Sequence, residues 1–474
     1  MSSKSVIVIG GGLAGLSSAV ALAEAGFRVR LLEKRPHLGG RAASYVLPGG
    51  EHVDNCQHVT LGCCTNLEEF YRRVGAANQI QFFERLMFAT PDGRRGVIQS
   101  AALPPPLHMA FSFAFYPLLG LADKFAIAQA LLAIAISGGQ PGDLASNVAG
   151  ENISMLAWLK KHRQTDRAIR RFWEVILVSA LDEDLGRIDA RYGIDVFWKA
   201  FLSTRAGYRV GIPRVPLSEL YEGCRRALAA QGGEVQLRAG VRGFQVAAGR
   251  VTGVEREDGS VETADYYLAA VPQDVLPELL PAEIVNGEPA FHDLRNLRTS
   301  PITGVHLWFD RTVMTEPFLT LLDTTTQWVF NKTQLYGTSA ENGGQYLQLV
   351  ISASYKLTSL SRQEIIALCL VELRAVLPAI RDASLVKGTV VKEMSATFSP
   401  APGSDQWRPR QGTSPTGLFL AGDWTSTGWP STMEGAVRSG FLAAEAILSD
   451  AGTPRKLLQP DLRAEGLARL WARE

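Results

Sequence analysis

The sequence predicts an α/β fold in which a Rossmann-like dinucleotide-binding domain is interleaved with an α+β substrate domain that bears a mixed sheet and a helical cap. The first observation is a β-branched run, Val6–Ile9, that leads directly into Gly10-x-Gly12-x-x-Gly15. The second is a buried-strand pattern near the other end of the chain, which ends in Gly422-Asp423. The third is the stretch between them, where helical and strand-like patterns occur in separate blocks.

Length, charge and cysteine usage limit the class of protein. The chain has 474 residues, which at ~150 residues per domain suggests about three domains. Lys and Arg number 48 against 47 Asp and Glu, and this balance excludes a nucleic-acid partner, which requires a basic face. The five cysteines include no C-x-x-C pair, so we expect no disulfide framework, no zinc knuckle and a reducing compartment. No signal peptide is visible, which favours the cytoplasm.

The first forty residues predict a nucleotide-binding β–α–β unit. Residues 6–9 and 28–32 read as buried strands, and residues 13–25 read as a helix that begins with Leu13 and Ala14. The three glycines permit a tight turn, a close approach of a pyrophosphate and close helix–strand packing. Glu33, followed by Lys34, ends the second strand, where a carboxylate can accept hydrogen bonds from both ribose hydroxyls of an adenosine.

The next segment indicates which dinucleotide is bound. Leu38-Gly39-Gly40-Arg41 follows Glu33 closely, and here the sequence resembles the large family of FAD-dependent amine oxidases and carotenoid desaturases. The resemblance implies FAD as the cofactor, with Gly40 and Arg41 near its diphosphate. It also implies that the backbone of Val241 meets the adenine. A solvated arginine in a surface turn is the alternative interpretation of Arg41.

The C-terminal signature completes the expected cofactor site. Gly422 and Asp423 end a buried strand, where the acid can accept hydrogen bonds from ribitol hydroxyls; a turn or capping acid is the alternative. A helix follows and continues through Leu448. It begins at Met433-Glu434-Gly435-Ala436, and we expect its N-terminus to face the flavin ring and to stabilise negative charge there.

Because these three cofactor segments are widely separated, the FAD-binding domain must be discontinuous. We predict an FAD-binding domain at 1–75, 210–272 and 411–450, a substrate domain at 76–209 and 273–410, and a C-terminal tail at 451–474. The first insertion reads as mostly helical after about residue 107, and 235–271 reads as a β-meander. The second insertion carries strand-like runs at 303–309, 328–332, 346–352 and 389–398, with a helix at 361–377.

Two further peptides narrow the resemblance. They are Asp54-Asn55-Cys56-Gln57-His58 and Gly428-Trp429-Pro430, and together they resemble the hydroxysqualene dehydroxylases, squalene-associated FAD enzymes of bacterial hopanoid pathways. Cys56 departs from the glycine that is usual in that family, which puts the conformation of the loop in doubt. The resemblance implies reduction of a long polyprenyl allylic alcohol to squalene, with hydride delivered from reduced FAD.

This chemistry suggests candidate catalytic residues. The hydroxyl must leave, so a proton donor is expected, and Asp54 with His58 could relay a proton, with Gln57 as another donor. Trp429 is the best candidate for an aromatic wall that shields an allylic cation. The alternative is that this loop binds FAD or fixes its own backbone. Glu51, His52, Asp54 and His58 lack a fourth ligand at motif spacing, so we expect no metal.

Uncharged segments in the first insertion suggest contact with lipid. Residues 96–122 and 125–142 contain no Asp, Glu, Lys or Arg. The run 107–122 contains Pro117 and is too short for a spanning helix, which needs about 20 apolar residues. We expect 103–136 to lie in a membrane interface, at the inner face of the cytoplasmic membrane, or to line an apolar cavity or a dimer contact. A helical stripe of Leu462, Leu467, Leu470 and Trp471 in the tail is a weaker candidate.

Other functions remain open at this stage. A carotenoid-type desaturase or isomerase would use the same fold and cofactor on another long isoprenoid, an amine oxidase would need an aromatic cage, and a flavin-containing lipid carrier would have no turnover. No second dinucleotide motif is visible, so the electron donor stays unknown. Asp182-Glu183-Asp184 is an acidic cluster that we expect to form a solvated turn, with an acid dyad as the alternative.

Overall fold

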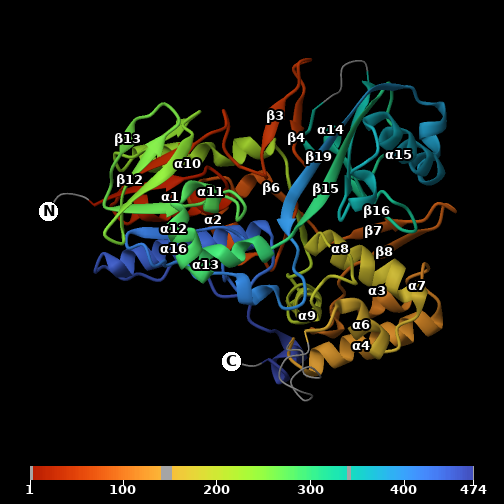
Figure 1. Cartoon of the computed structure of the whole chain (residues 1–474). Helices are drawn as coiled ribbons and strands as arrows, with labels where there is room; N and C mark the ends of the chain where they lie inside the picture. Colours follow the sequence, from red (N-terminus) through yellow and green to blue (C-terminus); the bar gives the residue numbers. More distant parts are fainter. Residues whose placement is uncertain (1–3, 140–151, 339–342, 473–474) are drawn as a thin grey trace.

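A parallel sheet forms the centre of one half of the molecule (Figure 1). The computed structural model describes residues 4–139, 152–338 and 343–472. The five strands lie in the order β10-β2-β1-β14-β20, and every neighbouring pair is parallel. They are β1 (Ser5–Ile9), β2 (Arg28–Glu33), β10 (Glu234–Leu237), β14 (Tyr266–Ala269) and β20 (Leu418–Leu420). One sheet is therefore assembled from strands that lie near the start, the middle and the end of the sequence.

Both faces of this sheet are covered, which explains the continuous apolar runs of its strands. Val6 and Val8 pack against the helices α1 (Leu13–Glu24), α10 (Glu222–Ala229) and α16 (Met433–Asp450). Ile7 and Ile9 face the opposite side, where β11 (Val241–Ala247), β12 (Arg250–Arg256) and β13 (Val261–Glu262) form a small antiparallel sheet. The predicted meander is thus correct only in part, because β10 and β14 belong to the parallel sheet.

A seven-stranded mixed sheet forms the centre of the other half (Figure 1). Its order is β19-β15-β18-β17-β16-β7-β8, and all neighbours are antiparallel except β16 and β7. The strands are β7 (Leu86–Ala89), β8 (Arg95–Ile98), β15 (Thr299–Phe309), β16 (Phe318–Leu321), β17 (Trp328–Asn331), β18 (Gln345–Ile351) and β19 (Leu385–Phe398). Helix α15 (Arg362–Val376) packs on one face, where a capping box of Ser361 and Glu364 begins it.

Helices gather below the mixed sheet (Figure 1). They are α3 (Ala110–Ala114), α4 (Leu121–Ile136), α6 (Met155–Lys161), α7 (Asp166–Ala168), α8 (Val175–Leu181) and α9 (Ala190–Val196), with π-helical turns at Ile169–Glu174 and Phe197–Leu202. The other elements are β3 (Ser44–Val46), β4 (His52–Asp54), β5 (Thr60–Leu61), α2 (Thr65–Arg73), β6 (Ile80–Phe83), β9 (Val210–Pro213), α11 (Leu276–Leu279), α12 (Ala282–Gly287), α13 (Pro289–His292) and α14 (Lys332–Leu335). The α/β fold with a mixed sheet and a helical cap is therefore confirmed. Residues 140–142 of the second uncharged stretch lie outside the described residues.

Two local expectations are wrong, and one predicted strand is confirmed except at its last residue. The predicted strand 328–332 ends at Asn331, and Lys332 begins α14 instead. The tail forms only a 3-10 turn, Gly466–Leu470, because it is anchored through backbone hydrogen bonds such as Ala468 N–H to the Pro105 carbonyl at 3.0 Å. Asp182 and Glu183 are buried, since they follow α8 into the interior instead of turning into solvent.

Candidate functional site

A glycine turn joins β1 to α1 at the carboxyl edge of the parallel sheet. Gly10 has a φ of +106°, and a Cβ there would lie 2.4 Å from the carbonyl oxygen of Ala270. A Cβ on Gly15 would lie 2.0 Å from the carbonyl oxygen of Gly10, so only glycine allows this close packing. The nearest atom to a Cβ on Gly12 would be Gly40 Cα at 3.9 Å. The turn therefore leaves open space in front of the α1 N-terminus, where a phosphate is stabilised.

Glu33 ends β2 beside this turn. Its carboxylate accepts the N–H of Gly11 at 2.6 Å and that of Arg35 at 2.7 Å. Each oxygen keeps further acceptor capacity, so the acid can still accept ribose hydroxyls. The N–H of Ala239 donates to the Glu33 carbonyl at 2.9 Å, which brings the start of β11, at Val241, to the same edge. The predicted adenosine residues thus lie together, whereas the Lys34 side chain is exposed.

The second glycine motif docks on the first and connects to the third. The N–H of Gly39 donates to the Gly11 carbonyl at 2.8 Å, and a Cβ on Gly40 would lie 3.0 Å from Gly12 Cα. The Arg41 guanidinium forms an ion pair with Asp423 and donates to the Ala396 carbonyl at 2.8 Å. Asp423 also accepts the Ser431 hydroxyl. The structure therefore brings Arg41 and Asp423 into one network, as a shared cofactor site requires.

The N-terminus of α16 is prepared for the same site. Thr432 caps the helix by accepting the N–H of Gly435 at 3.0 Å, and Met433 and Ala436 are half-buried in the first turn. Glu434 is only 1% exposed, and its carboxylate accepts the N–H of Leu67 at 2.7 Å. Burial raises the pKa of Glu434. Its side chain therefore holds α2, and only its backbone remains available for the predicted cofactor contact.

A buried ion pair fixes the loop that follows β4. Lys332 Nζ lies 2.8 Å from Asp54 Oδ2, and neither side chain is exposed. The Tyr336 hydroxyl donates to the same oxygen at 2.8 Å, and the Ser44 hydroxyl donates to the other oxygen at 2.6 Å. Lys332 also donates to Gln57 Oε1 at 2.6 Å. Lys332 and Tyr336 thus anchor the 54–58 loop to the mixed sheet, although no local sequence pattern connects them to it.

These contacts correct the predicted proton relay. The Lys332 ammonium holds the pKa of Asp54 below its usual range, so the carboxylate stays ionised at neutral pH and cannot donate a proton. His58 Nδ1 lies 2.9 Å from the Cys56 carbonyl oxygen, and burial lowers the pKa of His58, which favours the neutral imidazole. In the described part of the chain, no hydrogen bond joins Asp54 to His58. The side-chain amide of Gln57 is also engaged within the loop, because it donates to the His58 carbonyl at 3.0 Å.

The residues at this edge fit a molecule of FAD: a glycine turn without side chains in front of a helix, an acid at the end of β2, and a second helix that begins beside Asp423. The family model of flavin-containing amine oxidoreductases matches residues 13–448. The chain belongs to the flavin-containing amine oxidoreductase family. It is an FAD-dependent oxidoreductase.

Similar proteins support this assignment over nearly the whole chain. Zeta-carotene desaturase of Synechocystis is 29% identical over 475 residues, which cover 94% of this chain and 97% of the relative. The 15-cis-phytoene desaturase of Solanum lycopersicum is also 29% identical and covers 94% of this chain and 78% of the relative. An oxidoreductase from Methanosarcina mazei has a similar fold, with a TM-score of 0.73, 18% identity and coverage of 94% of this chain and 100% of that one. Putrescine oxidase gives a TM-score of 0.69 at 17% identity, over 94% and 99% of the two chains.

The structure does not support the predicted role of Trp429 as a wall for a cation. The ring is buried, and the ammonium of Lys199 lies 4.7 Å from its centroid. The Arg438 guanidinium lies 5.4 Å from the same centroid. Both cations are themselves ion-paired, and one acid, Asp461, pairs with each of them, so the Trp429 ring is already engaged in a structural cluster. Apart from Trp429, that cluster contains Cys63 and Ala200.

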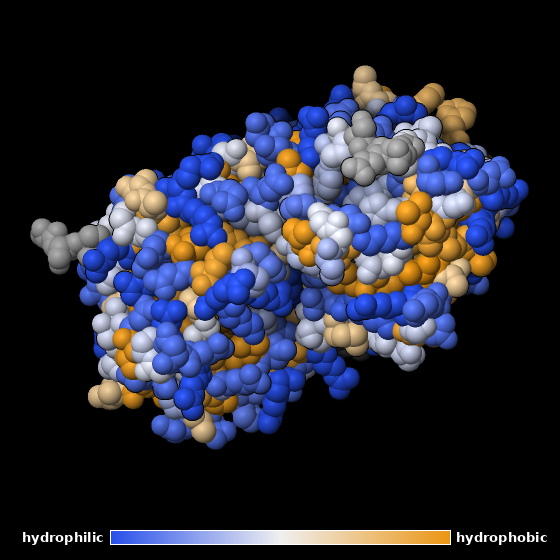
Figure 2. Space-filling view, turned by 90° about the horizontal axis from the view of Figure 1, so that it is seen from above, coloured by the Kyte–Doolittle hydropathy of each residue, from blue (hydrophilic) through white to orange (hydrophobic). Residues whose placement is uncertain are grey.

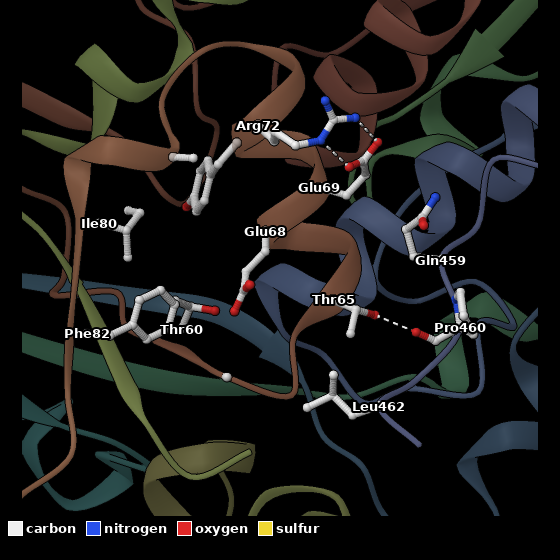
Figure 3. Close-up of a pocket in the computed structure, with 13 residues that line it drawn as sticks. Thr60, Thr65, Glu68, Glu69, Arg72, Ile80, Phe82, Gln459, Pro460 and Leu462 are labelled. Carbon is white, nitrogen blue, oxygen red and sulfur yellow. Dashed lines mark hydrogen bonds and ion pairs between the residues drawn. The ribbon is translucent and has the colours of Figure 1, made fainter. Parts of the chain in front are cut away.

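A separate pocket of about 460 Å³ lies beside α2 (Figure 3). Ile80, Phe82 and Leu462 provide apolar walls, and the Glu68 carboxylate points toward Thr60. Burial raises the pKa of Glu68. None of the lining residues belongs to the glycine motifs, so this pocket is not the nucleotide site. Elsewhere among the described residues, no cluster of three His, Cys, Asp or Glu side chains is arranged to hold a metal ion.

The segment 103–136 exposes large apolar side chains. Phe111, Phe115, Leu121 and Phe125 are 64%, 72%, 86% and 67% exposed. Within the described ranges, no helix is both long and apolar enough to span a membrane. Figure 2 shows the side of the molecule away from these helices, where hydrophobic areas are interrupted by hydrophilic side chains over both halves. The exposed phenylalanine rings thus lie together in one segment of the helical cap.

Proposed function

We propose that this FAD-dependent oxidoreductase exchanges a hydride with an allylic carbon of a long-chain isoprenoid. The observation that carries the proposal is the match over 94% of the chain to proteins named zeta-carotene desaturase and 15-cis-phytoene desaturase. When bound, the flavin supplies or accepts the hydride. The charge-free segments of the first insertion support an apolar substrate.

The residues of this chain perform three tasks in the proposed reaction. The glycine turn and Glu33 bind the adenosine and phosphates, and Arg41 with Asp423 orients the flavin end. The Asp54–Lys332 pair fixes the 54–58 loop. Both members are fully buried, so the loop is attached to a rigid and dry part of the mixed sheet, which protects a reactive carbon centre from water.

Two reactions fit this exchange. The relatives' names favour carotenoid-type desaturation, in which the hydride leaves the isoprenoid. Reductive dehydroxylation of hydroxysqualene to squalene, in which the hydride enters, is the second candidate. It is favoured by the peptides Asp54–His58 and Gly428–Pro430 and by the buried acid Asp182, which forms no ion pair with any described residue.

Product analysis distinguishes the two reactions. The purified holoprotein is incubated without oxygen, in one arm with phytoene or zeta-carotene and a quinone acceptor, and in the other with hydroxysqualene and dithionite. A more unsaturated carotene supports desaturation, and squalene supports dehydroxylation. Putrescine is the control for amine oxidation. Turnover of putrescine alone would refute an isoprenoid substrate.

We also propose that the enzyme docks peripherally on the inner face of the cytoplasmic membrane through the exposed rings of α3 and α4. A long isoprenoid is insoluble in water, so a bound membrane would supply it. Aromatic and aliphatic side chains in an interfacial segment bury into the headgroup region. An external electron carrier would meet the protein in the same compartment.

A further inference from the structure

A buried acid stands at the C-terminal end of α8. Asp182 is 4% exposed and adopts a left-handed conformation, with φ 51° and ψ 40°. Such a conformation is unfavourable in a residue other than glycine, so the surroundings must hold it. The carboxyl group accepts the N–H of Ala353 at 2.8 Å and the hydroxyl of Thr397 at 2.9 Å. These bonds tie α8 to the mixed sheet from two sides.

The surroundings of Asp182 favour its neutral form. Both hydrogen-bond donors are uncharged, and in the described part of the chain Asp182 forms no ion pair. The adjacent Glu183 is fully buried and pairs with Arg187, and the Tyr355 hydroxyl donates to it. Burial, together with the charge of Glu183, raises the pKa of Asp182 well above its usual range. These surroundings therefore favour the protonated form of Asp182 over its carboxylate.

Asp182 also lies beside the cofactor network. Its partner Thr397 follows Ala396, whose carbonyl accepts the Arg41 guanidinium, and precedes Phe398, whose N–H donates to Ser431 Oγ at 3.2 Å. From the 54–58 loop, the buried Cys56 lies near enough to interact electrostatically with Asp182. The groups that face Asp182 are thus Glu183 on its own element, Thr397 on β19, Ala353 after β18 and Cys56 from the loop.

Two buried acids with opposite environments flank the loop. Asp54 is paired with Lys332 and ionised, whereas Asp182 has only neutral donors. Pairs of acids whose environments differ in this way identify the groups that give and keep protons. A desaturase would need no such donor, because its substrate has no leaving group.

We propose that Asp182 donates its proton to the allylic hydroxyl of the substrate, an inference that rests on the proposed function and selects reductive dehydroxylation. The O–H bond of Asp182 breaks and its proton joins the hydroxyl oxygen. The C–O bond then breaks, and its electron pair leaves with water. The allylic carbon accepts a hydride, which the dihydroflavin form of the cofactor supplies, and becomes the hydrocarbon. The Asp182 carboxylate regains a proton from water, and dithionite restores the dihydroflavin in the test.

Asp182→Asn tests the donor role, with Asp184→Asn as the matched control. In Asp182→Asn the amide oxygen can still accept the N–H of Ala353, and the amide nitrogen can donate to the Thr397 hydroxyl oxygen, whereas the Asp184 side chain is 58% exposed. We expect Asp182→Asn to retain bound FAD, judged by its visible spectrum, and to form squalene from hydroxysqualene at least ~100-fold more slowly, since general acids contribute about 10²–10⁴-fold. Asp184→Asn should stay within about twofold of the wild type. A rate of Asp182→Asn within about threefold of the wild type would overturn the proposal.

A second measurement tests the proton itself without turnover. A raised pKa in the folded state adds stability at low pH that is lost as pH rises. The unfolding constant of the wild-type holoprotein, relative to Asp182→Asn, should therefore increase by up to ~10-fold per pH unit between about pH 4 and the pKa of folded Asp182. A pH-independent ratio would show that Asp182 holds no proton and would overturn the proposal. Absence of squalene with wild type would overturn the donor role and the dehydroxylation together, and carotene conversion would then leave the proposed isoprenoid function standing.

Discussion

At the scale of single residues, the Asp54–Lys332 pair explains why the most distinctive loop of the sequence has one conformation. Two charges without exposure are stable together only when each has further hydrogen bonds. Ser44, Tyr336 and the N–H of Leu217 provide these bonds to Asp54. The pair therefore makes the loop rigid, and it does so at the cost of strong dependence on each partner.

Removal of the ammonium should be severely destabilising. We expect Lys332→Met to lower the free energy of unfolding by about 3–5 kcal/mol, because a buried carboxylate is left without its cation. Denaturant unfolding of the holoprotein measures this. Lys387→Met is the control, since the Lys387–Glu51 pair is 35% and 34% exposed and should contribute about 0–1 kcal/mol. Equal effects of the two substitutions on the free energy of unfolding would contradict the stabilising role of the buried Asp54–Lys332 pair.

The pH dependence of the same variant has a defined sign. Lys332 lowers the pKa of Asp54, so this carboxylate stabilises the wild type above about pH 3.9 and loses that contribution as pH falls through its lower folded value. Without Lys332, burial would raise the pKa of Asp54 instead. The difference in stability between wild type and Lys332→Met should therefore be largest near pH 7 and decrease toward pH 4.

Arg41 provides a test of the cofactor network. Arg41→Ala removes the ion pair with Asp423 and the bond to the Ala396 carbonyl, so Asp423 is left 4% exposed without its cation. We expect FAD affinity to fall by about 10–100-fold, as the loss of charged hydrogen bonds worth about 1.5–3 kcal/mol implies. Equilibrium ultrafiltration of apoprotein with FAD measures it. Arg94→Ala is the control, because Arg94 forms an exposed pair with Asp92. An unchanged FAD affinity of Arg41→Ala would show that the Arg41–Asp423 network does not contribute to FAD binding.

Sequence reasoning located residues whose roles depend on neighbours in the chain and missed those that depend on contacts through space. Gly10, Gly15 and Glu33 lie within one β–α–β unit, so their spacing is sufficient. Lys332 reaches Asp54 from a position 278 residues away, and no periodicity records that contact. For the same reason, the predicted Asp54–His58 relay is wrong. The expectation that Asp182 is solvated is also wrong, because contacts with Ala353 and Thr397, which are distant in sequence, bury it.

At the scale of elements, the helices α3 and α4 of the cap carry mostly apolar side chains, and several of these are exposed to solvent. Phe111 of α3, Phe115 directly after α3 and Phe125 of α4 are exposed to solvent. The charged residues Asp123 and Lys124 are close to Phe125 in the sequence. Exposed rings of this density usually mark a binding surface. The order of strands and helices was largely predictable because their apolar runs are long, whereas the tail lacks such a run and is held by hydrogen bonds to distant segments, such as Gln459 N–H to Asn66 and Ala468 N–H to the Pro105 carbonyl.

The membrane proposal is tested on these elements. We expect the triple substitution of Phe111, Phe115 and Phe125 by Ser to abolish flotation with liposomes of phosphatidylethanolamine and phosphatidylglycerol, because it removes the apolar area that would insert. FAD absorbance should remain unchanged. Val371→Ser is the control, since Val371 is 67% exposed on the distant α15. Flotation of the triple variant at the wild-type level would assign the rings to another contact.

At the scale of the whole molecule, one parallel sheet is built from strands that begin at Ser5, Glu234 and Leu418, and the mixed sheet is built from the chain between them. This arrangement brings the two ends of the sequence together at Arg41 and Asp423 and attaches the 54–58 loop to the mixed sheet through Lys332. The flavin edge and the proposed substrate side are thus connected by the Asp54–Lys332 ion pair and by the hydrogen bond from Arg41 to the Ala396 carbonyl. The general fold was predictable from the glycine motifs, but the choice of reaction depends on side chains that only the folded chain brings together.

The most direct test of the account is the redox state of the bound flavin after a single encounter with an isoprenoid. Holoprotein reduced with dithionite is mixed without oxygen with hydroxysqualene, and oxidised holoprotein is mixed with phytoene, while flavin absorbance and product are recorded. We expect either hydroxysqualene or phytoene to change the flavin redox state and to yield one equivalent of product. If Asp182 is the proton donor, the reacting isoprenoid is hydroxysqualene. A flavin that responds to putrescine and to neither isoprenoid would contradict the account.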